Sequence, residues 1–118
     1  PKGIATGHRP PQNFLAWQRK TFGITADDRF TNLNGVAHDM MIRDIFQPLS
    51  IGAQLAIPHQ ADIYRPGRLL EWLEQVRPTV THMTPAMGQL LCMAAPDGHT
   101  LPLRAIFFGG DRLLPELT

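Results

Sequence analysis

Short β-rich runs alternate with amphipathic helical segments along the chain, and this alternation constrains the fold more than any other feature of the sequence. Apolar residues recur at helical spacing in four segments, near residues 11–22, 39–49, 66–77 and 84–95. Four β-type runs accompany them, at residues 29–33, 53–57, 79–82 and 104–108. Strands that alternate with helices are typical of βαβ units. We therefore predict an α/β fold with a mostly parallel sheet and helices on both of its faces.

Proline and glycine mark the predicted ends of these elements. Thr84 followed by proline is a helix start, with threonine as the N-cap and proline at the first helical position. Gly52 is placed to end the helix over 39–49, and Pro96 breaks the helix that begins after Thr84. Residues 115–117 resemble the first turn of another helix. Because the sequence lacks an initial methionine and stops inside this turn, we expect it to be a piece of a longer protein.

Composition excludes several classes of function. The 118 residues are 43% hydrophobic and 18% charged, which suits one globular domain rather than a disordered chain. The net charge is +1 without a Lys/Arg cluster, so neither nucleic acid nor an anionic membrane surface is an expected partner. No apolar run is long enough to span a bilayer.

The reactive side chains narrow the chemistry further. Cys92 is the one cysteine, which excludes an internal disulfide and fits a reducing, cytoplasmic setting; we expect it to be a small core residue. Ser50, the one serine, lacks a G-x-S-x-G frame, so a serine hydrolase is not indicated. The five histidines show no metal-ligand spacing, and no metal site is predicted.

Polar residues gather in three loops that follow predicted strands. His82 ends the run at 79–82, residues 109–111 follow the run at 104–108, and residues 34–39 follow the run at 29–33. Ligands of open α/β sheets bind at the carboxyl ends of the strands, so these loops can converge on one pocket.

Asp39 and Arg43 lie four residues apart at the start of a predicted helix and therefore share one face. Asp39 is either an N-cap that forms a plain surface bridge with Arg43, or a carboxylate that binds a substrate ammonium group beside an anion-binding guanidinium. His38 and His82 are each either a satisfied core histidine or a functional group. Lys2, next to Gly3, is suited to contact a phosphate. Spacing alone leaves these alternatives open.

Three segments resemble motifs of the adenylate-forming enzymes. The sequence begins Pro-Lys-Gly, as the phosphate loop of that superfamily ends. Residues 38–46 are similar to the F-D-x-S-x-x-x-x-F helix of nonribosomal peptide synthetase adenylation domains, and residues 107–111 resemble the G-G-E segment beside the adenine. The chain is most similar to the α-aminoadipate reductase type, in three further stretches that lie in the same register: 35–39, 43–55 and 81–91.

The resemblance implies a role for each matching residue. Residues 1–118 would form part of the large N-terminal subdomain of an adenylation domain, from the phosphate loop to the adenine pocket. Asp39 would bind the substrate's α-ammonium group, and His38, in place of the motif phenylalanine, would lie near the reacting carboxylate. The side-chain pocket would be lined by Met40, Arg43, His82, Phe107 and Gly109. The nucleotide would contact Lys2, Gly3, Gly109, Gly110 and Asp111.

The implied activity is ATP-dependent conversion of an amino acid with an acidic side chain, similar to aminoadipate, into an aminoacyl-adenylate. A carrier-protein phosphopantetheine thiol would then capture the product, and the Mg²⁺ ligands would lie outside this piece, which we expect to be inactive alone. Met40 stands where the pattern has proline and Gly109 where it has a larger residue, which indicates a wider or differently shaped pocket. Two alternatives remain: an acyl-CoA or aryl-acid ligase, which would not need Asp39, and a non-catalytic α/β interaction module.

Overall fold

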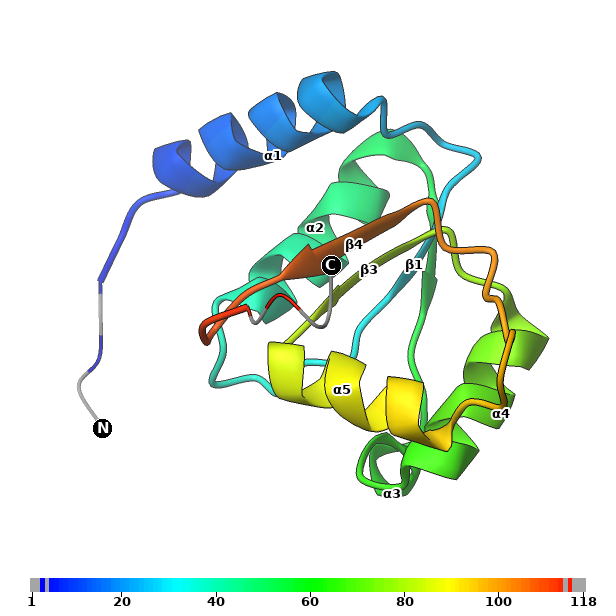
Figure 1. Ribbon diagram of the computed structural model, residues 1–118. Helices are drawn as coiled ribbons and strands as arrows, with labels where there is room; N and C mark the ends of the chain where they lie inside the picture. Colours follow the sequence, from blue (N-terminus) through cyan, green and yellow to red (C-terminus); the bar gives the residue numbers. More distant parts are fainter. Residues whose placement is uncertain (1–2, 4, 114, 116–118) are drawn as a thin grey trace.

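Four parallel strands form the centre of the fold (Figure 1). The computed structural model describes residues 3, 5–113 and 115. Its strands are β1 (Arg29–Thr31), β2 (Gln54–Ala56), β3 (Val80–Met83) and β4 (Ala105–Phe108). They are ordered β2-β1-β3-β4, and each neighbouring pair is parallel. The predicted α/β class with a parallel sheet is therefore confirmed.

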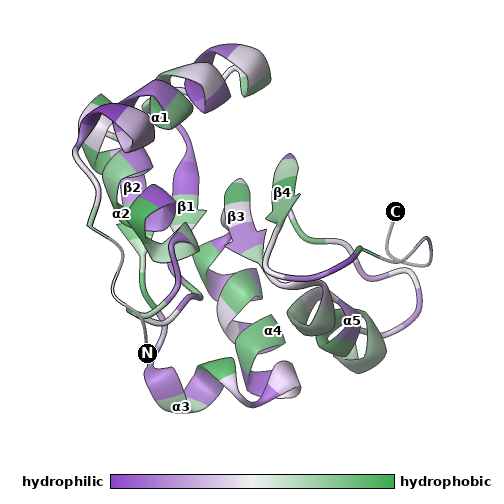
Figure 2. Cartoon of the chain, turned by 90° about the vertical axis from the view of Figure 1, so that its left-hand side faces the viewer, coloured by the Kyte–Doolittle hydropathy of each residue, from purple (hydrophilic) through white to green (hydrophobic). Residues whose placement is uncertain are grey.

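The part of the chain that the structure describes has five helices: α1 (Arg9–Phe22), α2 (Met40–Ile51), α3 (Gln60–Ile63), α4 (Pro66–Val76) and α5 (Pro85–Ala94). Figures 1 and 2 show α1 and α2 on one side of the strands and α4 and α5 on the other. Side chains alternate accordingly along β3 and β4. Val80 and Phe107 pack on the side of α1 and α2, whereas Met83 and Phe108 pack against α4 and α5.

The strand order creates a crevice between β1 and β3. From β1 the chain passes through α2 to β2 at one edge, then crosses back through α3 and α4 to β3, and continues through α5 to β4. The connections that leave β1 and β3 thus run in opposite directions, which is where open α/β sheets bind ligands. A groove of about 680 Å³ lies at this point, lined by residues that follow β1, β2 and β3.

Local sequence explains most of the helix boundaries. Thr84 Oγ1 accepts a hydrogen bond from the Met87 backbone N–H at 3.2 Å, which is the predicted N-cap of α5. Gly52, at φ 74°, ends α2 in the left-handed conformation that glycine tolerates best. Asp39 occupies the N-cap position of α2 but makes no side-chain capping bond there. Helix α3 was not predicted, because its four residues are too few to show a helical period.

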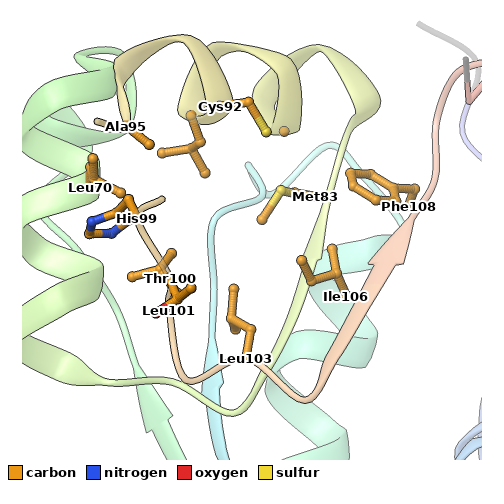
Figure 3. A pocket seen from close by; sticks show the side chains of 12 residues that line it. Leu70, Met83, Cys92, Ala95, His99, Thr100, Leu101, Leu103, Ile106 and Phe108 are labelled. Atoms are coloured by element: carbon orange, nitrogen blue, oxygen red, sulfur yellow. The ribbon is translucent and has the colours of Figure 1, made fainter. Parts of the chain in front are cut away.

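Cys92 is exposed, so its predicted place in the core is wrong. It lies on the side of α5 that borders a cavity of about 370 Å³ between α4, α5 and β4 (Figure 3). Apolar side chains from β4 and from the segment before it, such as Leu103, Ile106 and Phe108, form much of the facing wall. The helix therefore presents Cys92 to a cavity rather than to packed neighbours.

Asp28 ties the amino ends of three strands together. Its Oδ1 accepts hydrogen bonds from Thr79 Oγ1 and Arg104 Nε, both at 2.7 Å, and Arg104 Nη2 contacts its other oxygen. Arg104 Nη1 also donates to the backbone oxygen of Phe22 at the end of α1 at 2.9 Å. The hydrogen bonds from Arg104 are the main reason why the pKa of Asp28 falls to about 2. This cluster is at the opposite edge of the sheet from the groove.

Candidate functional site

Met40 and the glycines after β4 meet at the carboxyl end of the sheet. Met40 begins α2 and is 2% exposed. A Cβ atom added to Gly109 would lie 2.9 Å from Met40 Sδ, closer than packed atoms allow. Gly110 has φ 85°, and a Cβ there would lie 3.6 Å from Thr84 Cγ2. The absence of a side chain at residue 109 therefore makes room for Met40, which fills the space that a larger residue would occupy.

Asp39 and Arg43 form the pair that their spacing predicts. Arg43 Nη2 donates to Asp39 Oδ2 at 3.2 Å. The Asp39 side chain is 85% exposed, whereas that of Arg43 is 26% exposed. The Arg43 guanidinium lies over the ring of Phe14 on α1, 5.1 Å from its centroid. The result is a carboxylate open to solvent beside a guanidinium that is held by an aromatic ring.

His82 does not share an open space with Asp39. Its side chain is fully buried on β3, and both ring nitrogens are engaged: Nδ1 lies 2.7 Å from Asp44 Oδ1, and Nε2 lies 2.8 Å from Gln18 Nε2. Phe107 is stacked on the imidazole at 4.9 Å, with 24° between the ring planes. The expectation that His82 lines the pocket therefore differs from its position in the structure, where Phe107, Gln18 and Asp44 surround the ring.

His38 is exposed in the loop between β1 and α2. Together with Asn32, Asn34, Tyr64 and Thr84 it lines the groove of about 680 Å³ at the crevice. Its side chain is thus open to a ligand at the carboxyl edge of the sheet, unlike that of His82. The groove brings together the loops that follow β1 and β3, two of the three loops that were expected to converge.

The residues predicted to contact the nucleotide lie near both ends of the sequence, and the structure describes all of them except Lys2. Lys2 lies outside the described residues, and Gly3 is exposed in the segment that leads to α1. Gly110 and Asp111 are exposed after β4, and Asp111 Oδ1 accepts a hydrogen bond from the Arg112 backbone N–H at 2.7 Å. Gly109 donates its backbone N–H to Met83 O at 3.2 Å, which fixes the start of this loop against β3.

Asp44 and Gln18 are residues of this region that the sequence did not single out, whereas Asn34 belongs to the polar loop 34–39 that it did. Asp44 is fully buried and accepts from Asn34 Nδ2 at 2.7 Å as well as contacting His82. A signal was present: Asp44 lies one helical turn after Met40, on the core-facing side of an amphipathic helix. A carboxylate there requires buried hydrogen-bond partners. The partner Gln18 is 64 residues away from His82 in sequence, and no local pattern connects the two.

Two further properties concern the described residues as a group. Within the described ranges, no three His, Cys, Asp or Glu side chains come together in a way that could hold a metal ion. None of the helices in that part of the chain combines the length and apolar character that a membrane crossing requires.

Comparison with protein families gives the chain its relatives. The model of the AMP-binding enzyme family matches residues 1–118. The chain belongs to the AMP-binding enzyme family. This confirms the resemblance to adenylate-forming enzymes that the three motifs carried.

Two kinds of curated protein are similar to this chain in sequence. The chain is 48% identical over 116 residues to L-2-aminoadipate reductase of Saccharomyces cerevisiae, covering 96% of this chain and 8% of that protein. It is 31% identical over 114 residues to a linear gramicidin synthase of Brevibacillus parabrevis, covering 96% of this chain and 1% of that protein. The chain thus spans only a small fraction of these relatives.

Solved structures give the same picture. The nonribosomal peptide synthetase FmoA3 has a TM-score of 0.90 at 29% identity, over 99% of this chain and 13% of that chain. The Vibrio cholerae adenylation domain AlmE, solved with glycyl-adenosine-5'-phosphate, has a TM-score of 0.85 at 28% identity, over 97% of this chain and 22% of that chain. The fold of the described residues is therefore that of an adenylation-domain segment.

Proposed function

We propose that the protein carrying this segment activates an amino acid with an acidic side chain, similar to aminoadipate, by joining it to the AMP moiety of ATP. The amino-acid carboxylate would attack the α-phosphate, forming an aminoacyl-adenylate and releasing pyrophosphate. The observation that carries the proposal is the Asp39–Arg43 pair at the start of α2, with its groups 3.2 Å apart. A carboxylate beside a guanidinium complements a substrate that has both an ammonium group and a side-chain carboxylate.

Six residues of the region have a proposed role toward the amino acid. Asp39 binds the α-ammonium group, and its 85% exposure leaves it accessible. Arg43 binds the side-chain carboxylate and exchanges its internal bond to Asp39 for the substrate. His38, which is exposed at the groove, lies near the reacting carboxylate. The walls of the side-chain pocket come from Met40, Phe107 and Gly109.

The nucleotide is proposed to bind along the carboxyl edge of the sheet. Lys2 and Gly3 hold the phosphates, while Gly109, Gly110 and Asp111 pass beside the adenine. The exposed Gly110, at φ 85°, lets a flat ring approach the backbone, which supports this assignment. Bound Mg²⁺ would neutralise phosphate charge, and its ligands are assigned to residues outside 1–118.

A carrier-protein domain, in the same chain or a partner chain, is the proposed recipient of the acyl group. Its phosphopantetheine thiol would displace AMP from the adenylate and form a thioester. We assign the reaction to the cytoplasm, which supplies ATP and keeps a lone thiol such as Cys92 reduced.

Amino-acid-dependent exchange of pyrophosphate into ATP tests the proposal on a complete adenylation domain that carries this segment. We expect exchange with aminoadipate and, more weakly, with glutamate. Asp39→Ala should abolish the exchange, and Arg43→Ala should lower kcat/KM for the acidic substrate by about 10–100-fold, as expected for the loss of a charge-assisted contact of about 1.5–3 kcal/mol. Arg68→Ala is the matched control, since Arg68 forms a similar exposed pair with Glu71 on α4, also at 3.2 Å.

Three other outcomes each redirect the assignment. Exchange with neutral amino acids alone would keep the reaction and remove the anion-binding role of Arg43. Exchange only with acids that lack an amino group would favour an acyl-CoA or aryl-acid ligase. No exchange with any acid would favour a non-catalytic module, a candidate supported by the exposure of Asp39 and its surface-like bridge to Arg43.

A further inference from the structure

A buried row of hydrogen bonds connects α1, α2 and β3 behind the Asp39–Arg43 pair. It consists of Gln18 on α1, His82 on β3 and Asp44 on α2, joined by contacts of 2.8 and 2.7 Å. Each of these three residues is at most 1% exposed. A ligand cannot touch them, so any effect they have on a bound substrate must act through neighbouring residues.

One tautomer of His82 satisfies both of its ring nitrogens, while Oε1 of Gln18 is buried without a hydrogen-bond partner among the described residues. A carboxylate only accepts hydrogen bonds, so His82 Nδ1 carries the hydrogen and donates to Asp44. The lone pair on Nε2 then accepts from the Gln18 amide N–H. The second oxygen of Asp44 is also occupied, by Asn34 Nδ2 at 2.7 Å. The buried carboxylate is therefore paired on both sides, which holds α2 to β3 at a defined position.

Both ends of the row lie next to the Arg43 contact. Asp44 follows Arg43 directly on α2. Gln18 lies four residues after Phe14 on α1, and residues at this spacing share one helix face. The Arg43 guanidinium lies over the Phe14 ring at 5.1 Å. The row therefore fixes, through His82, the distance between the helix that carries the guanidinium and the helix that carries the ring beneath it.

We infer that Gln18, His82 and Asp44 are positioning residues that keep Arg43 over Phe14 and beside Asp39, and that they thereby set the affinity for an acidic amino acid. The inference rests on the proposed amino-acid activation. Apolar side chains in a core are often as stabilising as a buried ionic or polar group, so stability alone does not account for this row. What hydrogen bonds add is a fixed orientation, which a site for a charged side chain requires.

Two substitutions of His82 separate the ends of the row. In His82→Asn the side-chain amide takes the place of Nδ1 and keeps the bond to Asp44, whereas in His82→Gln it takes the place of Nε2 and keeps the bond to Gln18. Both remove the imidazole and its stacking on Phe107, so loss of packing is common to both. We expect His82→Gln to raise KM for the acidic amino acid by at least about tenfold, and His82→Asn, which breaks the Gln18 end of the row, by about threefold, with KM for ATP unchanged in both.

Two glutamines provide a second comparison that does not alter His82. Gln18→Met removes the amide at one end of the row while nearly preserving its shape. Gln47→Met makes the same change at a residue of α2 that is also 1% exposed but is not part of the row. We expect Gln18→Met to raise KM for the acidic amino acid by about threefold or more and Gln47→Met to leave it unchanged. Thermal unfolding of all four variants shows which of them fold.

The measurements are steady-state pyrophosphate exchange on a complete adenylation domain carrying this segment. Equal KM values for His82→Asn and His82→Gln would overturn the inference, as would a parallel rise of KM for ATP, since either result is what a purely structural role gives. Should either His82 variant not fold, equal KM values for the two glutamine variants would overturn it instead. No exchange in the unaltered enzyme would overturn the proposed function and the inference together, so the two failures are distinguishable.

Discussion

At the scale of single residues, Met40 and Gly109 share one small volume. Sequence comparison with the family pattern treats them as two separate departures and predicts a wider or differently shaped pocket. In the structure a Cβ atom on residue 109 would lie only 2.9 Å from the Met40 sulfur, so the Met40 side chain occupies space that a side chain at residue 109 would need. The two departures therefore compensate each other, and the space left by the glycine is filled rather than open.

This sharing of volume predicts that substitutions at the two positions are not additive. Gly109→Ala should lower the free energy of unfolding by about 1 kcal/mol, because the Met40 sulfur must shift. In a Met40→Ala background, which itself costs about 2–5 kcal/mol, the same change should cost nothing or be stabilising. Urea denaturation of the single and double variants measures the coupling, expected to exceed about 0.5 kcal/mol.

Gly35→Ala serves as the control for that cycle. A Cβ at Gly35 would meet no atom within 4 Å, so the substitution should change stability by less than about 0.5 kcal/mol. Additive effects of Met40→Ala and Gly109→Ala would contradict the shared volume.

At the scale of elements, the N-cap of α5 links local sequence to the groove. Thr84→Ala should lower the free energy of unfolding by about 1 kcal/mol, because the Met87 backbone N–H loses its acceptor. Thr84→Ser keeps the hydroxyl and should cost less. Thermal or urea unfolding of both variants checks this, and an equal loss in the two would assign the effect to the methyl group instead of the hydrogen bond.

The features that could be predicted from the sequence are those that depend on residues close together in the chain. Boundaries set by a local residue were predictable, as at Gly52 and Thr84, because a cap acts within one turn. The Asp39–Arg43 pair followed from helical spacing in the same way. For His82 the sequence left two alternatives, a satisfied core histidine or a functional group, because the choice depends on Gln18 and Asp44, which reach it from two other elements. For Cys92 the prediction was wrong, since an apolar neighbourhood in sequence does not reveal which face of a helix is covered.

At the scale of the whole molecule, the carboxyl and amino ends of the strands differ in their role: one borders the groove and the other carries the Asp28 cluster. The carboxyl edge holds the groove and the exposed loops. The amino edge is fastened by Asp28, which joins the residues before β1, β3 and β4, while Arg104 extends the cluster to the end of α1. Because α1 also carries Phe14 and Gln18, the amino-edge cluster and the buried row hold the same helix at two separate points.

The amino-edge cluster predicts a specific dependence of stability on pH. The pKa of Asp28 is lowered to about 2 from an ordinary 3.8, so its contribution is complete above about pH 4 and is lost as the pH falls toward 2. Since one pKa unit corresponds to about 1.4 kcal/mol, Asp28→Asn should lower the free energy of unfolding by about 2 kcal/mol at pH 7 and change it little near pH 2. Urea denaturation across this range measures the difference, with Asp27→Asn as the exposed neighbouring control. A loss in Asp28→Asn that is the same at every pH would mean that its hydrogen bonds, not its charge, fasten this edge of the sheet.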